Sequence, residues 1–157
     1  YGYLPKNSKK WTYNKFKKKV INRINLYMKK DIKNRKDIEQ LVNVFYQKVR
    51  NDKSIGRFFT ELPPAHWEKH INIMYNFWGN ILFFTGEYDG NPMNLHRHLS
   101  KINNIEKRHF IRWNKLFTDT VDELFEGEKT TYLKMRALNI SAILQKNIFT
   151  NKNIQTK

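Results

Sequence analysis

The sequence predicts an all-α fold, and three observations support this prediction. Apolar residues recur at steps of three or four along most of the chain, no segment sustains the alternation of a strand, and Pro and Gly gather between the periodic segments. The chain has 157 residues, which is about the size of one domain. Apolar residues make up 39% and aromatic residues 15%, so a core built largely from rings is expected.

The N-terminal region is expected to form a basic amphipathic helix. Residues 1–10 look irregular because glycine, proline, asparagine and serine lie close together there. From Trp11 to Lys30 an apolar stripe follows helical spacing, with lysines in the intervening positions. The members of the stripe are Tyr13, Phe16, Val20, Ile24 and Tyr27.

Five further helices are expected in the rest of the chain. The first begins after Asp37, read as an N-cap with Gln40 three residues on, and ends before a break over 51–56. Pro63 and Pro64 introduce the second helix. The glycine-rich turn 85–92 ends it, and Glu126-Gly127 separates the last two helices. The expected ranges of the four later helices are 65–84, 92–99, 106–125 and 128–148.

The charge divides the chain into parts. The net charge is +16, and residues 1–36 hold 13 Lys or Arg with 1 acidic residue, whereas residues 37–157 hold 17 and 13. We therefore expect a basic extension over 1–36, a main domain over 37–149 and a tail over 150–157. The extension suits nucleic acid, an anionic membrane surface or a protein partner, and we favour an anchor to a larger protein or ribonucleoprotein assembly.

Several features bear on location. The first residue is Tyr1, which would be explained equally by loss of a targeting peptide or by a sequence that begins inside a longer chain. A mitochondrial presequence is one candidate, so an intracellular and specifically mitochondrial location is expected. No stretch reaches the roughly 20 apolar residues of a transmembrane helix. The absence of cysteine excludes disulfides and thiolate metal sites.

The residues alone leave the chemistry open. His66 and His70 have a spacing able to hold a metal, but Trp67 stands where the zinc-protease motif needs glutamate. No phosphate-binding loop or nucleophile elbow is present. A helical domain rich in rings is a natural host for a flat apolar cofactor such as haem. On composition alone, however, ordinary core packing is favoured over a cofactor pocket.

Five ordered blocks of sequence identify a resemblance. They are LVNVFYQKVRNDKSIG, HWEKHINIMYNFWGNILF, YDGNPMNLHRHL, HFIRWNKLFTDTVDELF and RALNISAIL. Over about residues 37–148 the chain resembles the group III truncated haemoglobins. The resemblance departs from the family pattern at Arg57 and Asn114, and it does not account for residues 1–36.

The resemblance implies a truncated globin fold, a 2-over-2 helical sandwich, that binds haem b. The proximal iron ligand of the family falls on His96. Its distal polar residues fall on Tyr46, His70 and Trp113. The resemblance implies that Tyr46 and Trp113 each donate a hydrogen bond to a diatomic ligand, and that His70 either gates entry of the ligand or adds a further contact. The pocket walls implied are Phe45, Met74, Phe77, Trp78, Phe110 and Phe117, with Arg97 or Arg108 as a partner for a haem propionate.

Two functions follow as expectations. The first is a haem protein that binds dioxygen or another diatomic ligand and is anchored through its basic extension. Chemistry on nitric oxide or peroxide would need a reductant partner, so ligand binding is favoured over catalysis. The alternative is a globin fold co-opted as a structural subunit of a large mitochondrial complex, a ribosome or respiratory assembly, with haem lost or incidental.

Overall fold

The computed structural model describes residues 16–17, 28–60 and 63–152. All regular secondary structure in these ranges is helical, which confirms the predicted class. The helix expected from Trp11 to Lys30 and the irregular segment before it lie almost entirely outside the described residues. The named helices are α2 (Arg35–Arg50), α3 (Arg57–Thr60), α4 (Pro64–Phe83), α5 (Pro92–Ile102), α6 (Lys107–Leu124) and α7 (Glu128–Lys152).

Helix α2 begins earlier than its sequence suggested. Asn34 is the N-cap: its backbone is extended, and its side chain accepts a hydrogen bond from the backbone N–H of Asp37 at 3.3 Å. The Asp37 carboxylate in turn accepts from the backbone N–H of Asn34, which completes a capping box. The prediction of Asp37 as the N-cap was therefore wrong, because Asp37 is the reciprocal partner three residues inside the cap.

The compact unit that carries these helices begins at Asp31, six residues before the boundary expected from charge. Ile32 is fully buried in its core. The carboxylate of Asp31 accepts hydrogen bonds from backbone N–H groups at the start of α7. The charge pattern assigned residues 31–36 to the basic extension because three of them are lysine or arginine. Asp31 and Ile32, which make these contacts, are the neighbours of those basic residues in the sequence.

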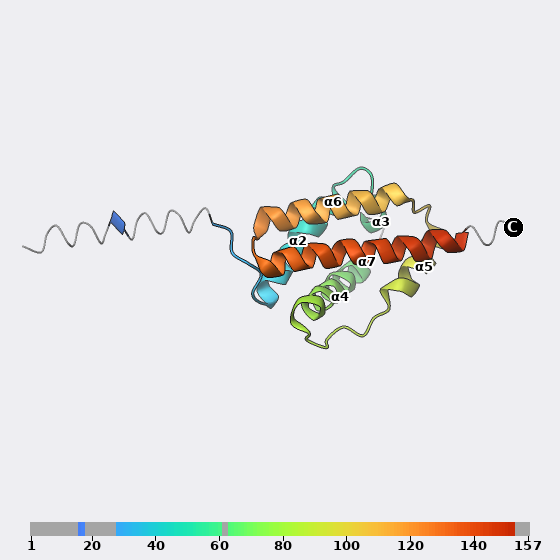
Figure 1. Cartoon of the computed structure of the whole chain (residues 1–157). Coiled ribbons are helices and arrows are strands. Elements are labelled where there is room, and N and C mark those ends of the chain that lie inside the picture. The colour runs from blue at the N-terminus through green and yellow to red at the C-terminus, as the bar shows by residue number, and fades with distance from the viewer. Residues whose placement is uncertain (1–15, 18–27, 61–62, 153–157) are drawn as a thin grey trace, which may run out of the picture. The chain divides into compact units, whose positions relative to one another are not determined.

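Two packed pairs of helices build the unit (Figure 1). Helix α2 packs against α4 and also against α6, and α6 packs along α7. The short connection between α6 and α7 makes those two antiparallel (Figure 1). The core lies between the pairs and consists of Ile32, Ile38, Leu41, Val42, Phe45, Tyr46, Val49, Ile55, Phe77, Trp78, Leu82, Phe117, Val121, Phe125, Leu133 and Ala137.

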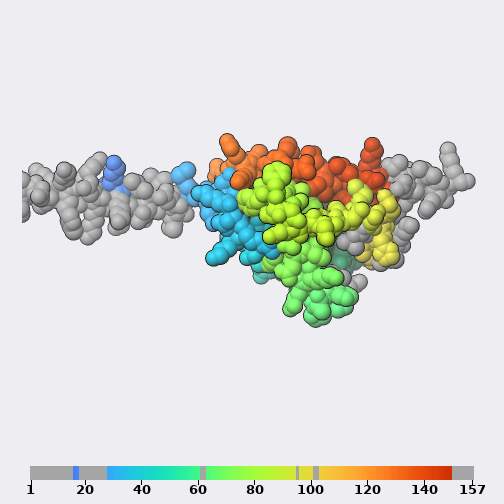
Figure 2. Space-filling view, turned by 90° about the horizontal axis from the view of Figure 1, so that it is seen from below, coloured from blue at the N-terminus to red at the C-terminus, as the bar shows by residue number. Residues whose placement is uncertain are grey.

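Helix α5 approaches the core through a long connection from α4. Phe84 adopts a left-handed backbone conformation with φ of 55°, which ends α4 one residue before the predicted end. The Asn91 side chain then caps α5 by accepting from the backbone N–H of Asn94 at 3.0 Å. Figure 2 shows α4 on one face of the unit with α5 beside it.

Helices α5 and α7 extend beyond their predicted ends at residues 99 and 148. The longer α7 runs into the segment expected to be a C-terminal tail. Within the described ranges, no helix is both long and apolar enough to span a bilayer.

Candidate functional site

His96 lies on α5, where one of its ring nitrogens is hydrogen-bonded to the backbone and the other can bind a ligand. Its Nδ1 lies 2.7 Å from the carbonyl oxygen of Pro92, four residues earlier. Since a carbonyl oxygen only accepts, Nδ1 carries the proton and donates it. Burial lowers the pKa of His96 despite this hydrogen bond, so the imidazole stays neutral. Nε2 therefore keeps its lone pair, the form of histidine that ligates a metal.

Tyr46 lies on α2 within a cage of rings. It is 3% exposed, and its ring meets those of Phe45, Phe59, Trp67 and His70 edge to face, with centroids 4.9 to 5.6 Å apart. Burial raises the pKa of Tyr46, so the hydroxyl remains protonated. No hydrogen-bond acceptor for this hydroxyl occurs among the described residues. The donor is thus available to something outside the chain.

His70 on α4 is also neutral and unpaired. Its ring centroid lies 5.0 Å from that of Tyr46. Burial, with a smaller electrostatic contribution from His96, lowers the pKa of His70 to about 4. Its Nε2 is buried and has no hydrogen-bond partner among the described groups. A buried polar atom without a partner is costly, so this nitrogen is suited to meet a ligand or water.

Trp113 on α6 belongs to a stack of rings that continues into the core. Its ring lies parallel to that of Phe117, with centroids 5.0 Å apart and an interplanar angle of 8°. Phe117 stacks in turn on Trp78 at 4.8 Å. Phe45 presents its edge to both Trp113 and Tyr46, at 5.0 and 4.9 Å. Phe45 therefore fixes the spacing between the two residues predicted to donate hydrogen bonds.

The other predicted wall residues are not equally close to this stack. Phe77 is 9% exposed and contacts Trp78, and Met74 packs against the same core. Phe110 instead meets Phe149 of α7, with centroids 6.2 Å apart. The structure thus gathers Met74, Phe77, Trp78 and Phe117 along one continuous core, while Phe110 lies between α6 and α7.

The remaining histidines have other surroundings. His66 and His98 are exposed. His109 is buried, and its Nδ1 accepts a hydrogen bond from the backbone N–H of Glu106 at 3.0 Å, which helps to cap α6. In the part of the chain that is described, no group of three or more potential metal ligands occurs.

The two arginines suggested as propionate partners differ. Arg108 pairs with Glu106 at 2.8 Å and is exposed. Arg97 follows His96 on α5, and its Nε is buried without a hydrogen-bond partner among the described residues. Arg97 is the better placed of the two to meet an anionic group near His96.

Sequence reasoning missed three contributors to this site. Phe59 and Trp67 complete the rings around Tyr46, and the Pro92 carbonyl orients His96. The spacing of four between Pro92 and His96 was a usable signal, because position i on a helix lies beneath position i+4. No local signal marked Phe59, which lies on the short helix α3 after the 51–56 break.

The group of residues fits an iron porphyrin. Such a cofactor needs one neutral imidazole, apolar walls and polar groups on the opposite side. His96 offers the imidazole, the rings around Phe45 and Phe77 offer apolar surface, and the unpaired Nε2 of His70 requires a partner.

Comparison with known proteins gives consistent matches. A family model described as bacterial-like globin matches residues 26–147. A group 3 truncated hemoglobin of Campylobacter jejuni is 29% identical over 125 residues, covering 78% of this chain and 96% of that protein. The crystal structure of the group III truncated hemoglobin from Campylobacter jejuni matches with a TM-score of 0.69 at 29% identity and covers 77% of this chain and 95% of that one.

Two more distant structures support the fold alone. The 2/2 hemoglobin from Synechococcus sp. PCC 7002, solved in the cyanomet state with covalently attached heme, matches with a TM-score of 0.60 at 20% identity. The match covers 74% of this chain and 92% of the Synechococcus chain. The Chlamydomonas reinhardtii THB1 structure matches with a TM-score of 0.56 at 23% identity, covering 73% of this chain and 89% of its own.

Proposed function

Because the chain belongs to the bacterial-like globin family and has the truncated 2-over-2 globin fold, we propose that it binds haem b through Nε2 of His96. The same proposal assigns the side of Tyr46, His70 and Trp113 to a small diatomic ligand. Haem, when bound, supplies an iron atom that takes up such gases.

The observation that carries the proposal is the orientation of His96. The Pro92 carbonyl holds the Nδ1 proton at 2.7 Å, and burial keeps the ring neutral. A histidine held this way presents Nε2 without first releasing a proton, and the hydrogen bond makes that nitrogen a better ligand. An exposed surface histidine has neither property.

The opposite side supplies donors for the ligand. Tyr46 keeps its proton because burial raises the pKa of its hydroxyl. The indole N–H of Trp113 likewise has no acceptor among the described residues. Two donors held apart by Phe45 favour a ligand with partial negative charge on its outer atom, because each hydrogen bond to a developing charge strengthens in a dry site.

The surroundings favour retention of the cofactor. The rings of Phe77, Trp78 and Phe117 exclude water from the apolar faces of a porphyrin. The buried, unpaired Nε of Arg97 suits a propionate carboxylate. The strongly basic N-terminal residues, in turn, suit attachment of the domain to an anionic partner, and anchoring is part of this proposal.

An absorption spectrum of the purified full-length chain tests the proposal. We expect a Soret band that shifts on reduction and again with carbon monoxide. His96→Ala is expected to lose the band, whereas His98→Ala, at an exposed position on the same helix, keeps it. A folded wild-type chain that does not take up haem, or a His96→Ala variant with unchanged haem content, contradicts the proposal.

A further inference from the structure

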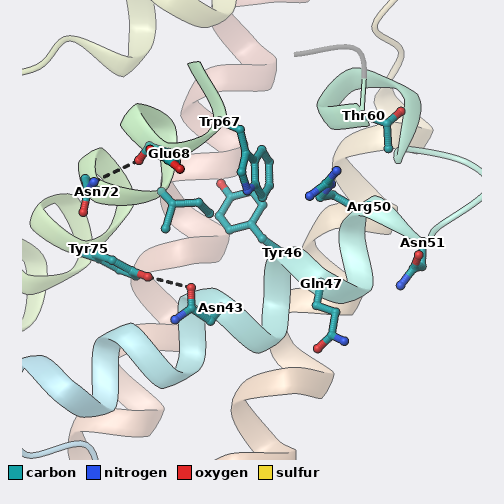
Figure 3. Close-up of a pocket in the computed structure, with 11 residues that line it drawn as sticks. Asn43, Tyr46, Gln47, Arg50, Asn51, Thr60, Trp67, Glu68, Asn72 and Tyr75 are labelled. Atoms are coloured by element: carbon teal, nitrogen blue, oxygen red, sulfur yellow. Dashed lines mark hydrogen bonds between the residues drawn. The ribbon is translucent and has the colours of Figure 1, made fainter. Parts of the chain in front are cut away.

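A surface groove of about 580 Å³ lies between α2 and α4, on the outer side of Tyr46 (Figure 3). Tyr46 and Trp67 both line it, and their ring centroids are 5.6 Å apart. The same two rings contact His70, at 5.0 and 5.9 Å. Tyr46 and Trp67 are therefore shared between the groove and the predicted ligand side of the site.

The end of the groove near Tyr75 is held together by hydrogen bonds. The Tyr75 hydroxyl donates to the side-chain oxygen of Asn43 at 2.7 Å and so links α4 to α2 (Figure 3). The Asn72 amide donates to the backbone carbonyl of Glu68 at 3.1 Å. The Tyr75–Asn43 bond makes this end an unfavourable place for the two helices to separate, whereas the Asn72–Glu68 bond lies within α4.

The other end carries a positive charge against an aromatic ring. The Arg50 guanidinium lies over the indole of Trp67, 4.8 Å from the ring centroid. No carboxylate partner of Arg50 occurs in the described parts of the chain. Figure 3 shows Glu68, the acidic residue of the groove, on the opposite side of Trp67. An anion that approaches along the Arg50 side thus meets the Arg50 guanidinium first.

We propose that this groove is the entry site for small monovalent anions, of the size of azide or nitrite, on their way to the ligand side of the site. Trp67 is the barrier that must rotate, and Arg50 is the charge that collects the anion. A cation–π contact at an exposed site is weak enough to open readily. The inference rests on the proposed function, because the anion's destination is the iron side of Tyr46 and His70.

Association rates test the route on the haem-loaded chain. Azide binding to the ferric protein is measured by stopped flow, and carbon monoxide binding to the ferrous protein serves as the neutral comparison. Arg50→Gln is expected to lower the association rate of azide about threefold and to leave the association rate of carbon monoxide unchanged. A threefold effect is the size expected from one charge that acts across several ångströms of water. Glu68→Gln is expected to raise the association rate of azide, and Trp67→Ala is expected to raise the association rates of both azide and carbon monoxide.

The matched control is Lys36→Gln, which removes the same charge from an exposed position at the other end of α2. If Lys36→Gln slows azide as much as Arg50→Gln, the effect is one of net charge and the proposal is overturned. Unchanged rates for both ligands in Trp67→Ala overturn it as well.

A second measurement separates this inference from haem binding itself. In the full-length chain without haem, iodide and caesium quench tryptophan fluorescence, and subtraction of the Trp67→Phe signal isolates Trp67. We expect the ratio of the iodide to the caesium quenching constant for Trp67 to exceed the ratio for free tryptophan amide, and Arg50→Gln to lower it. A wild-type ratio no higher than that of free tryptophan amide contradicts anion collection. A missing Soret band contradicts the proposed function, and the quenching ratio still tests the groove.

Discussion

The carboxylate of Asp31 caps α7 although the two lie 99 residues apart in the sequence, because Thr130 donates to it from its backbone N–H at 2.9 Å and from its hydroxyl at 2.7 Å. The backbone N–H of Lys129 adds a third hydrogen bond at 3.0 Å. Burial opposes ionisation of Asp31, but these bonds outweigh it and hold the pKa of its carboxyl below the usual value. A side chain that precedes α2 therefore satisfies free N–H groups at the start of α7.

Asp31→Ala is expected to lower the free energy of unfolding by about 1–2 kcal/mol at neutral pH, the usual cost of losing an N-cap. Since the folded pKa is depressed, this contribution is complete above the unfolded value of 3.8 and is lost as the pH falls through the folded value. Urea denaturation at pH 7 and pH 3 measures both. The control is Asp89→Ala at an exposed position, and an equal loss in both variants contradicts the cap.

Gly127 is expected to tolerate no side chain while Asp31 is present. Its φ is +149°, and a β-carbon there would lie 2.4 Å from the Asp31 carboxyl carbon. Gly127→Ala is therefore expected to cost about 2 kcal/mol or more of folding free energy. The same substitution in the Asp31→Gly background should cost less, because the Asp31 carboxyl and β-carbons, 2.4 and 2.6 Å from the added atom, are then gone and only the unfavourable φ remains. Additive losses in this double-mutant cycle would show that the two residues do not interact.

The position of truncation is expected to decide whether the domain folds well. Removal of residues 1–30 keeps the Asp31 cap, the buried Ile32 and the Asn34 cap of α2. Removal of residues 1–36 deletes all three, which should cost about 3 kcal/mol or more from one apolar side chain and two caps. Thermal unfolding of both truncated chains distinguishes them, and identical midpoints would mean that residues 31–36 are dispensable.

Much of the fold was predictable because helix periodicity and turn residues act locally. Pro64 and the glycines of 85–92 marked the limits of α4 to within a residue. The start of α2 was misplaced because Asn34 and Asp37 are both good capping residues, and only the extended backbone at Asn34 identifies the cap. The extent of the domain was less accessible, since the bond from Asp31 to Thr130 joins residues 99 apart.

The candidate site was predictable only through the resemblance. Composition and spacing could not separate His96 from His98, two residues away, because both are compatible with a solvated helix face. The structure separates them, since His96 is half-buried with its Nδ1 on Pro92 and His98 is exposed. The ring contacts of Phe59 and Trp67 with Tyr46 depend on how α3 and α4 pack, which no local pattern encodes.

Tyr46→Phe is expected to speed dissociation of dioxygen from the haem-loaded chain. The substitution keeps the ring contacts with Phe45 and His70 and removes one hydrogen-bond donor, so the loss of about 1 kcal/mol corresponds to roughly a fivefold faster rate. Carbon monoxide, which accepts hydrogen bonds poorly, should be affected less. Stopped-flow dissociation measures both, and an unchanged dioxygen rate removes Tyr46 from the ligand's contacts.

The stability of the haem-free chain is expected to depend on His70 between pH 6.5 and 4. Burial, helped by His96, lowers the folded pKa of His70 to about 4, whereas the unfolded chain titrates near 6.5. Between these values the unfolded state binds more protons, so the stabilising effect is complete above pH 6.5 and is lost as the pH falls to 4. Each proton contributes about 1.4 kcal/mol per pH unit in that window.

Urea denaturation at intervals across this window tests the dependence. His70→Gln is expected to flatten the decline in unfolding free energy but not abolish it, because burial also lowers the pKa of His96. His98→Gln, at an exposed position on α5, is the matched substitution for comparison. A His70→Gln chain with the wild-type slope would mean that His70 is solvated in the haem-free chain, and its Nε2 would then need no ligand to satisfy it.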